Sequence, residues 1–416
     1  MIESLYRTRS LDDLDGETQI TAGLLSSIRE LTPRIKEKAA DYAAAGAYDE
    51  SLHSAFLDAG LYKALVPKKY DGFGLGLDQY LQLGMELARA DPGVAWMFIL
   101  GAGHAFHAAS SYEETAQDEL FGQGPYIAPL RAIPSGRSIK VDGGYVLTGD
   151  FPWSSGSRYS TFTLAVAPTF DADGEPLGAM MHSVPRSQYE ILDDWGGGRT
   201  IGMEASSSNT IRIKDVFVPE RFVVPYAFRQ HELGDSGTAG FQQHRNPLYL
   251  GRGMTFTTAE LASIQVGAAR AALDEFETLM RKAKAGLPPF APRVESAEYH
   301  RWFGKMTALV DTAETILLGA AHQYMTLARR WAETGSEFSP SDDMRLRAIV
   351  QQAGKMALKV TDLAFTTAGT SAAAKGTRLE KIYRDVSMLK THIVVGQLDV
   401  HYSSASEYHF DGPLRF

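Results

Sequence analysis

Residues with the potential to bind and position a ligand gather in the stretch 149–156, Gly-Asp-Phe-Pro-Trp-Ser-Ser-Gly. Trp153 has a flat apolar face, and the hydroxyl of Ser155 can both donate and accept a hydrogen bond. Gly156 has no side chain, so a ligand could approach its backbone closely. These features suit a planar heterocycle with polar edge atoms. A buried tryptophan beside an ordinary polar turn would have the same sequence, so the interpretation needs support from the rest of the chain.

Histidines form the second group of candidate side chains. His104 and His107 interrupt the apolar residues 94–109, and His392 lies near the C-terminus. The first two do not have the spacing of a zinc-binding helix, and neither an H-E-x-x-H motif nor a cysteine is present. We therefore expect no metal site. A histidine in an apolar helix is often a hydrogen-bonded core residue, and that alternative stays open for His104 and His107.

Two further segments carry polar candidates. Residues 205–210, Ala-Ser-Ser-Ser-Asn-Thr, form a hydroxyl-rich turn that enters a strand and contains Ser208 and Thr210. Residues 226–253 are polar and glycine-rich, have no clear period, and contain Arg252. A long irregular segment in a compact chain often covers a binding site. Either segment could equally be an ordinary loop or linker.

Three regions of different texture must position these residues. Residues 1–121 have apolar residues at helical spacing, whereas residues 122–228 alternate β-branched and aromatic residues between Gly, Asp and Pro turns. Residues 229–416 begin with an irregular segment, 229–253, and continue as amphipathic helices. We expect an α+β fold that is mostly α: a helical domain, a middle antiparallel β-barrel or sandwich, and a C-terminal four-helix bundle. The four bundle helices are predicted at about 255–285, 296–333, 341–368 and 378–403.

Composition excludes several function classes. The chain has 416 residues, of which 44% are hydrophobic, so it can bury a large core. No run of 18 apolar residues predicts a membrane span, and the N-terminus lacks a hydrophobic signal region, so a cytoplasmic protein is expected. The absence of cysteine excludes disulfides and thiolate chemistry. The net charge of −9, without a basic run, argues against nucleic acid as a partner.

Three motifs, in their order along the chain, resemble the acyl-CoA dehydrogenase superfamily. Residues 65–75, Leu-Val-Pro-Lys-Lys-Tyr-Asp-Gly-Phe-Gly-Leu, are similar to its P-x-x-Y-G-G-x-G-L turn. Residues 214–220, Lys-Asp-Val-Phe-Val-Pro-Glu, are similar to its D-V-x-V-P motif. Residues 378–385, Arg-Leu-Glu-Lys-Ile-Tyr-Arg-Asp, are similar to its E-R-x-x-R-D stretch. The resemblance covers residues 20–403 and implies the three-domain fold expected above.

One departure separates this chain from the dehydrogenases of that superfamily. Their catalytic carboxylate lies about eight residues after the Arg-Asp pair, where this sequence has Ile393. The chain more closely resembles the flavin-dependent monooxygenases built on the same fold, which are the oxygenase components of two-component systems. The resemblance rests on residues 95–98, Ala-Trp-Met-Phe, followed by His104, and on residues 149–156. It also rests on the Arg-Asp pair followed by His392.

The resemblance implies a reaction and a set of roles. A separate reductase would supply reduced FMN, or alternatively reduced FAD. O2 would add to the reduced flavin to give a C4a-hydroperoxyflavin. This adduct would hydroxylate a small aromatic or phenolic substrate. Ser155 and His104 would be hydrogen-bond donors to that adduct, and His392 the base for the phenol; His107 could replace His104 because the spacing is offset by one residue. The resemblance also implies a homotetramer, a dimer of dimers. Residues expected to hold the flavin are Trp153, Ser155, Gly156, Ser208, Thr210 and Arg252.

Three alternatives remain on sequence grounds. An N-oxygenase of an amine or amino sugar would use the same fold and flavin chemistry. An acyl-CoA dehydrogenase with a displaced base would need another carboxylate, and a non-catalytic binding module would need no flavin. A serine that the family has before its Ile-Ala-Pro stretch is replaced here, where Pro125 and Tyr126 precede Ile127, so the substrate is not fixed by the resemblance.

Overall fold

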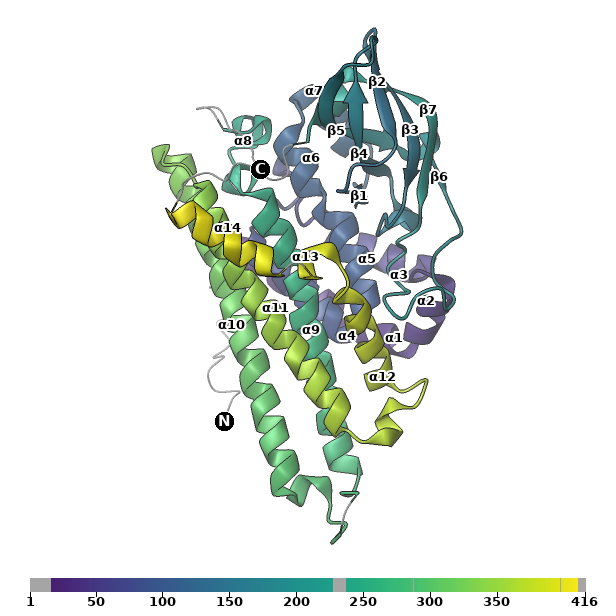
Figure 1. The fold of residues 1–416 in the computed structure, drawn as a ribbon, viewed down its shortest axis with the longest axis vertical. Helices are drawn as coiled ribbons and strands as arrows, with labels where there is room; N and C mark the ends of the chain where they lie inside the picture. The colour runs from purple at the N-terminus through teal and green to yellow at the C-terminus, as the bar shows by residue number, and fades with distance from the viewer. Residues whose placement is uncertain (1–15, 227–236, 287, 397, 411–416) are drawn as a thin grey trace.

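A computed structural model describes residues 16–226, 237–286, 288–396 and 398–410. Helices pack beside and beneath a twisted β-sheet, and a bundle of long helices extends away from them (Figure 1). No described helix combines the length and the apolar composition that crossing a membrane requires. The N-terminal helices are α1 (Gly16–Glu37), α2 (Ala39–Ala45), α3 (Glu50–Asp58), α4 (Leu77–Ala90), α5 (Pro92–Gly103), α6 (Ala105–Ser111) and α7 (Glu114–Phe121).

Helix α5 forms the centre of the N-terminal region, and all twelve of its residues are buried. Asp91 caps it, because the carboxylate accepts a hydrogen bond from the Val94 N–H, and Pro92 fits the first turn, where no N–H is needed. The helix ends at Gly103, and α6 starts two residues later. His104 therefore lies at a break between two buried helices.

The middle region is one eight-stranded sheet rather than separate sheets. Its strand order is β6-β7-β3-β2-β4-β5-β8, and β1 pairs with β4. Most pairings are antiparallel, as expected, but β1–β4 and β2–β4 are parallel. The strands are β1 (Leu130–Arg131), β2 (Arg137–Val141), β3 (Gly144–Phe151), β4 (Phe162–Phe170), β5 (Pro176–Pro185), β6 (Glu190–Ile191), β7 (Ile211–Pro219) and β8 (Val223–Pro225).

The bundle differs from the expected four continuous helices in one place that matters for the site. Its fourth helix ends at Leu389, and residues 390–392 form a turn that contains His392. In the described part of the segment expected to be irregular, residues 237–253, a short helix α8 is present. The helices are α8 (Ala239–His244), α9 (Gly253–Lys282), α10 (Ala297–Thr334), α11 (Pro340–Thr367), α12 (Arg378–Leu389), α13 (Ile393–Gly396) and α14 (Leu398–Phe410).

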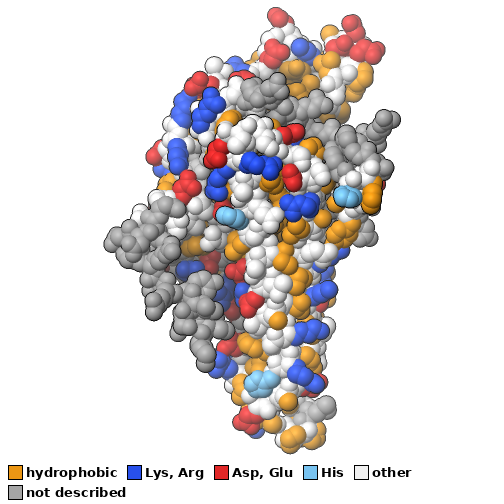
Figure 2. Space-filling view, turned by 90° about the vertical axis from the view of Figure 1, so that its left-hand side faces the viewer, with side chains coloured by type: hydrophobic (Ala, Val, Ile, Leu, Met, Phe, Trp, Pro, Cys, Tyr) orange, Lys and Arg blue, Asp and Glu red, His pale blue; other side chains and the backbone are white. Residues whose placement is uncertain are grey.

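Helix α9 is the core helix of the bundle. It packs against α10 and α11 of the bundle, against α12, and against α4 and α5 of the N-terminal region. It therefore joins the bundle to the N-terminal helices in one hydrophobic core. On one outer face of the molecule, acidic and basic side chains are interspersed with hydrophobic ones (Figure 2).

Candidate functional site

One cavity lies where helix α5, the β-sheet and the turn after α12 meet. Its volume of about 360 Å³ falls within the range of small-molecule sites. Its wall comes from segments far apart in the sequence, so it exists only in the folded chain. The lining residues are Trp96, Leu100, His104, Leu130, Arg131, Ala132, Ile133, Trp153, Ser155, Trp195, Met203, Ser206, Ser208, Thr257, Leu261, Met388, Leu389, Thr391, His392, Ile393 and Val394.

A chain of hydroxyl groups runs along one wall of this cavity. The Trp96 indole nitrogen donates to Ser155 Oγ over 2.9 Å. Ser155 Oγ lies 2.8 Å from Ser208 Oγ, which lies 2.7 Å from Ser206 Oγ. Because Ser155 already accepts from Trp96, its own proton is available to Ser208 or to a ligand. The predicted residues Ser155 and Ser208 are thus brought together, and Trp96 and Ser206 join them.

Two loops form this wall, and backbone hydrogen bonds tie them together. The Ser154 N–H donates to the Asn209 carbonyl, and the Gly156 N–H donates to the Ser206 carbonyl, each over 3.1 Å. Trp153 and Ser207 have positive φ angles of 63° and 47°. Such left-handed conformations are unfavourable for residues other than glycine and often occur at functional sites.

Trp153 lies at the mouth of the cavity, with 51% of its surface exposed. Its ring meets that of Trp195 edge to face, with the centroids 5.3 Å apart. Two aromatic rings at the mouth give a planar ligand an apolar surface to contact. The flavin-binding role of Trp153 stays a prediction, and the structure places its ring in the cavity wall.

Gly156 has a structural role that the sequence did not indicate. Its φ angle is +84°, and a Cβ atom there would lie 2.9 Å from the Met97 carbonyl oxygen and 3.1 Å from Gly101 Cα. The residue does not line the cavity. Glycine at 156 therefore allows the loop to pack against α5, rather than allowing a ligand to approach the backbone.

His104 lines the cavity, but its hydrogen bond gives it a different role from the predicted one. Nδ1 lies 2.7 Å from the Ala128 carbonyl oxygen, which can only accept, so Nδ1 carries the proton. Burial lowers the pKa of His104 to about 4, so the ring is neutral at pH 7. Nε2 then has a lone pair and accepts a hydrogen bond. His104 is thus placed as an acceptor, whereas the sequence led us to expect a donor.

His107 does not line the cavity. It is buried, and its ring packs edge to face against Phe106 and Phe256, with centroids 5.1 and 6.2 Å away. Of the two histidines that the sequence comparison left open, His104 is the one that lines the cavity.

His392 reaches the cavity from the turn after α12 and has the complementary hydrogen-bonding pattern. The Val394 N–H lies 3.3 Å from Nδ1, which therefore accepts, and the neutral ring carries its proton on Nε2. Burial, with a contribution from the positive charge of Arg131, lowers the pKa of His392 to about 4. The ring meets Trp96 edge to face at 5.3 Å. His392 is thus placed as an N–H donor rather than as the predicted base.

The cavity contains little formal charge. Both of its histidines are neutral at pH 7, and no aspartate or glutamate is among its described lining residues. Ile393, at the position of the dehydrogenase carboxylate, lines the wall with 45% of its surface exposed. A carboxylate base is therefore missing from the described wall as well as from the motif.

Two predicted flavin-binding residues lie outside the cavity wall. Thr210 turns its backbone toward Asp194, whose carboxylate accepts from the Thr210 N–H over 2.9 Å. Arg252 is buried beneath the α10–α11 connection, where its guanidinium donates to the Phe338 carbonyl and pairs with Glu337 at 2.7 Å. The structure does not bring either residue to the cavity.

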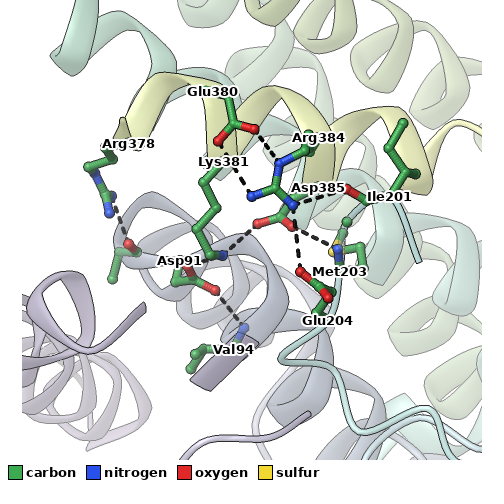
Figure 3. A network of polar contacts seen from close by, with 12 residues as sticks. Asp91, Val94, Ile201, Met203, Glu204, Arg378, Glu380, Lys381, Arg384 and Asp385 are labelled. Carbon is green, nitrogen blue, oxygen red and sulfur yellow. Dashed lines mark hydrogen bonds and ion pairs between the residues drawn. The ribbon is translucent and has the colours of Figure 1, made fainter. Parts of the chain in front are cut away.

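A buried ion network connects the cavity loop to the helices (Figure 3). Lys381 Nζ lies 2.6 Å from Asp91 Oδ2 and 2.8 Å from Asp385 Oδ2. The other oxygen of Asp91 caps α5 at Val94, and the other oxygen of Asp385 accepts from the Met203 N–H over 2.7 Å. One lysine thus joins α12, α5 and a cavity-lining residue.

Arg384, the neighbour of Asp385 in the Arg-Asp motif, fixes the same loop from a second side. Its guanidinium donates to the Ile201 carbonyl over 3.1 Å and pairs with Glu380 at 2.5 Å and with Glu204 at 3.6 Å. Neither Arg384 nor Asp385 lines the cavity. The motif therefore positions the loop that carries Met203, Ser206 and Ser208.

Comparison with known protein families identifies the fold. Residues 24–118 match the acyl-CoA dehydrogenase N-terminal domain, and residues 259–397 match the acyl-CoA dehydrogenase C-terminal domain, so together the matches cover more than half of the chain. The chain belongs to the acyl-CoA dehydrogenase family.

Its full-length relatives are oxygenases. The chain is 28% identical over 393 residues to a pigment production hydroxylase of Rhodococcus sp., covering 94% of this chain and 97% of the relative. It is 26% identical over 376 residues to the flavin-dependent monooxygenase oxygenase subunit HsaA of Mycobacterium tuberculosis, covering 89% and 91%. The fold matches that of XiaF from Streptomyces sp. in complex with FADH2 and glycerol, with a TM-score of 0.84, 21% identity and coverage of 96% and 98%. The predicted resemblance and the predicted enzyme class are confirmed.

The cavity wall suits a reduced flavin. Thr257 Oγ1 is buried and has no hydrogen-bond partner among the described residues. It lines the cavity together with Ser155 and Ser208, so three hydroxyl groups can meet the polar edge of an isoalloxazine ring. Trp153 offers that ring an apolar surface. No group of three or more His, Asp or Glu side chains in the described residues is arranged to hold a metal ion.

Proposed function

We propose that this protein is the oxygenase component of a two-component flavin-dependent monooxygenase and that it hydroxylates a small phenolic substrate. The observation that carries the proposal is the cavity wall, which combines a chain of serine hydroxyls with two neutral histidines and has no carboxylate among its described residues. A bound reduced flavin would supply two electrons to dioxygen, so that one oxygen atom enters the substrate and the other leaves as water.

The serines and the aromatic residues would hold the flavin. The Ser155 and Ser208 hydroxyls, fixed by Trp96, can bind polar atoms at the edge of the ring system. The Nε2–H of His392 adds a donor from the opposite domain. Because these groups are fixed before the ligand arrives, they need little reorganisation during the reaction.

His104 would act on the substrate. Its Nε2 lone pair can accept the phenol proton in a hydrogen bond, which increases electron density on the aromatic ring. Burial disfavours the imidazolium form, so we expect His104 to orient and polarise the hydroxyl before oxygen transfer rather than to remove the proton completely. Burial of the wall also keeps water away from the reacting atoms.

We further infer that a separate reductase supplies the flavin and that the protein forms a homotetramer. The name of HsaA as an oxygenase subunit supports the first point. FMN is our first candidate. FAD is the second, and the complex of XiaF with FADH2 supports it. Titration of both reduced flavins, and sedimentation of the holoenzyme, test these points.

An N-oxygenase remains the second candidate, because the same His104 acceptor could take a proton from an ammonium group. We therefore test function with phenols and amines side by side. The protein, reduced flavin and substrate are mixed with ¹⁸O2, and the product is analysed by mass spectrometry. One ¹⁸O atom on carbon supports the proposal, and ¹⁸O on nitrogen supports the second candidate. Reduction of oxidised flavin by an acyl-CoA, without ¹⁸O incorporation, would contradict both.

A further inference from the structure

Arg131 is the one fully charged side chain among the described residues of the cavity wall. It lies in β1, a two-residue strand that pairs with β4, where Arg131 is opposite Ala165. The residue is half-buried, and its Nε atom is buried without a hydrogen-bond partner. Its charge therefore acts on the inside of the cavity.

Two other arginines of the same domain each bind a carboxylate with two nitrogens, whereas Arg131 does not. Arg212 binds both carboxylate oxygens of Asp150 at 2.7 Å, and Arg221 binds both oxygens of Glu119. No carboxylate of the described residues forms an ion pair with Arg131, and burial lowers its pKa without any acidic group to oppose the shift. A half-buried cation without a counter-ion is unfavourable in the free protein, and binding an anion removes that cost.

The electrostatics of the cavity point in the same direction. With His104 and His392 neutral, Arg131 leaves the described cavity wall with one positive charge at pH 7. Arg131 is close enough to His392 for its charge to contribute to the lowered pKa of that ring. Any ligand placed against His392 therefore experiences a positive potential.

We propose that Arg131 binds a carboxylate on the substrate, so that the enzyme selects aromatic acids over neutral aromatic compounds. This inference rests on the proposed monooxygenase function. A carboxylate is ionised at pH 7 without help from the protein, and its two oxygens match the fork of a guanidinium. A phenol is protonated at that pH and offers a single oxygen. The hydroxyl groups near Ser155 lie on other segments, which leaves the flavin edge and the carboxylate with separate partners.

The test compares binding of matched acids and amides to the protein saturated with reduced FMN under anaerobic conditions. The probes are a panel of hydroxyphenyl and indolyl carboxylates and the corresponding carboxamides, followed by the fluorescence of Trp96, Trp153 and Trp195 in the cavity wall. We expect the preferred acid to bind about 10- to 100-fold more tightly than its amide, as for a hydrogen bond to a charged group. Arg131→Gln should reduce this ratio to near one, and Arg131→Lys should restore part of it.

Arg137→Gln is the matched control, because Arg137 is an exposed residue of the neighbouring strand β2 and its loss changes the net charge equally. The ratio should stay unchanged in this variant. Equal binding of every acid and its amide by the wild type would overturn the proposal. The proposal would also be overturned if Arg131→Gln bound reduced FMN more weakly and kept the acid-to-amide binding ratio of the wild type. Arg131 would then bind the phosphate of the flavin and not a carboxylate of the substrate. If the proposed function fails instead, acids still bind selectively but no ¹⁸O enters any of them.

Discussion

Replacing Lys381 with methionine should destabilise the protein and, at the same time, weaken the attachment of the cavity loop that contains Met203. The side chain of Lys381 is 12% exposed and separates two carboxylates, Asp91 and Asp385, which are 1% and 2% exposed. Methionine fills similar space but leaves two buried carboxylates without their shared cation. Breaking a buried ion pair in this way costs about 3–5 kcal/mol.

The expected change in melting temperature follows from the chain length. The entropy of unfolding is about 2.1 cal/mol/K per residue. For a chain of 416 residues, a loss of about 1 kcal/mol in the free energy of unfolding therefore lowers Tm by about 1 °C. Lys381→Met should therefore lower Tm by about 3–6 °C at pH 7.5, as measured by scanning calorimetry at one scan rate. Lys305→Met is the control, because Lys305 is exposed on α10 and its loss should shift Tm by less than about 0.5 °C.

The pH dependence provides the stricter test. In Lys381→Met, burial and the charge of Asp91 raise the pKa of Asp385 with no lysine to oppose them, so the folded state binds more protons than the unfolded state above the ordinary carboxyl pKa of about 4. The Tm deficit relative to wild type must therefore shrink as the pH falls toward that value. Adding Asp385→Asn, which removes one of the two charges, should recover part of the deficit at neutral pH. A deficit below about 1 °C, or one that grows on acidification, would refute this reasoning.

Three further predictions concern the cavity and the loop packed beside it. Ser155→Ala should leave the Trp96 indole without its acceptor and shorten the lifetime of oxygenated flavin by about 10- to 100-fold, measured as increased hydrogen peroxide. His104→Leu should slow phenol hydroxylation about 10²- to 10⁴-fold, while His392→Gln, which retains an N–H donor, should lose less activity than His392→Leu. Equal, large losses in His392→Gln and His392→Leu, with most activity kept in His104→Leu, would instead assign the base to His392. Gly156→Ala should lower Tm by about 1–3 °C, since φ is +84° and α5 occupies the space of the new Cβ; an unchanged Tm would contradict that packing role.

Sequence reasoning found the fold and the cavity residues that carry a recognisable motif. The polar end of β3 predicted Trp153 and Ser155, and the segment after the Arg-Asp pair predicted His392; all three line one cavity. These residues follow elements whose periodicity is strong. The break at residues 390–392 was missed, because the apolar spacing continues through it.

Roles that depend on the third dimension could not be predicted. The proton positions on His104 and His392 are set by a carbonyl and an N–H that follow from folding and not from the histidines' own sequence positions. Trp96 meets Ser155 across 59 positions of sequence. Arg131 was not predicted as a site residue, because an isolated arginine after an apolar run has the same sequence pattern as a surface residue.

Two predicted residues lie away from the cavity wall, for simple physical reasons. Arg252 was expected at the flavin because the resemblance places an arginine before the bundle, yet the Phe338 carbonyl and Glu337 bind its guanidinium. In the segment 206–210, Ser206 and Ser208 share one side through their 2.7 Å contact, while Thr210 lies beyond the cavity beside Asp194. Ser207, between the two serines, has a left-handed backbone conformation, so the side chains of this segment do not alternate between two faces as they would in a strand.

The central claim is that this cavity activates dioxygen on a reduced flavin. Its most direct test mixes the protein and reduced FMN rapidly with oxygenated buffer, without substrate, and follows the absorbance spectrum. The account predicts a transient species, distinct from both reduced and oxidised FMN, that lasts seconds or longer in the wild type and decays faster in Ser155→Ala. Direct conversion of reduced to oxidised FMN at the rate of free flavin, with either FMN or FAD, would contradict it.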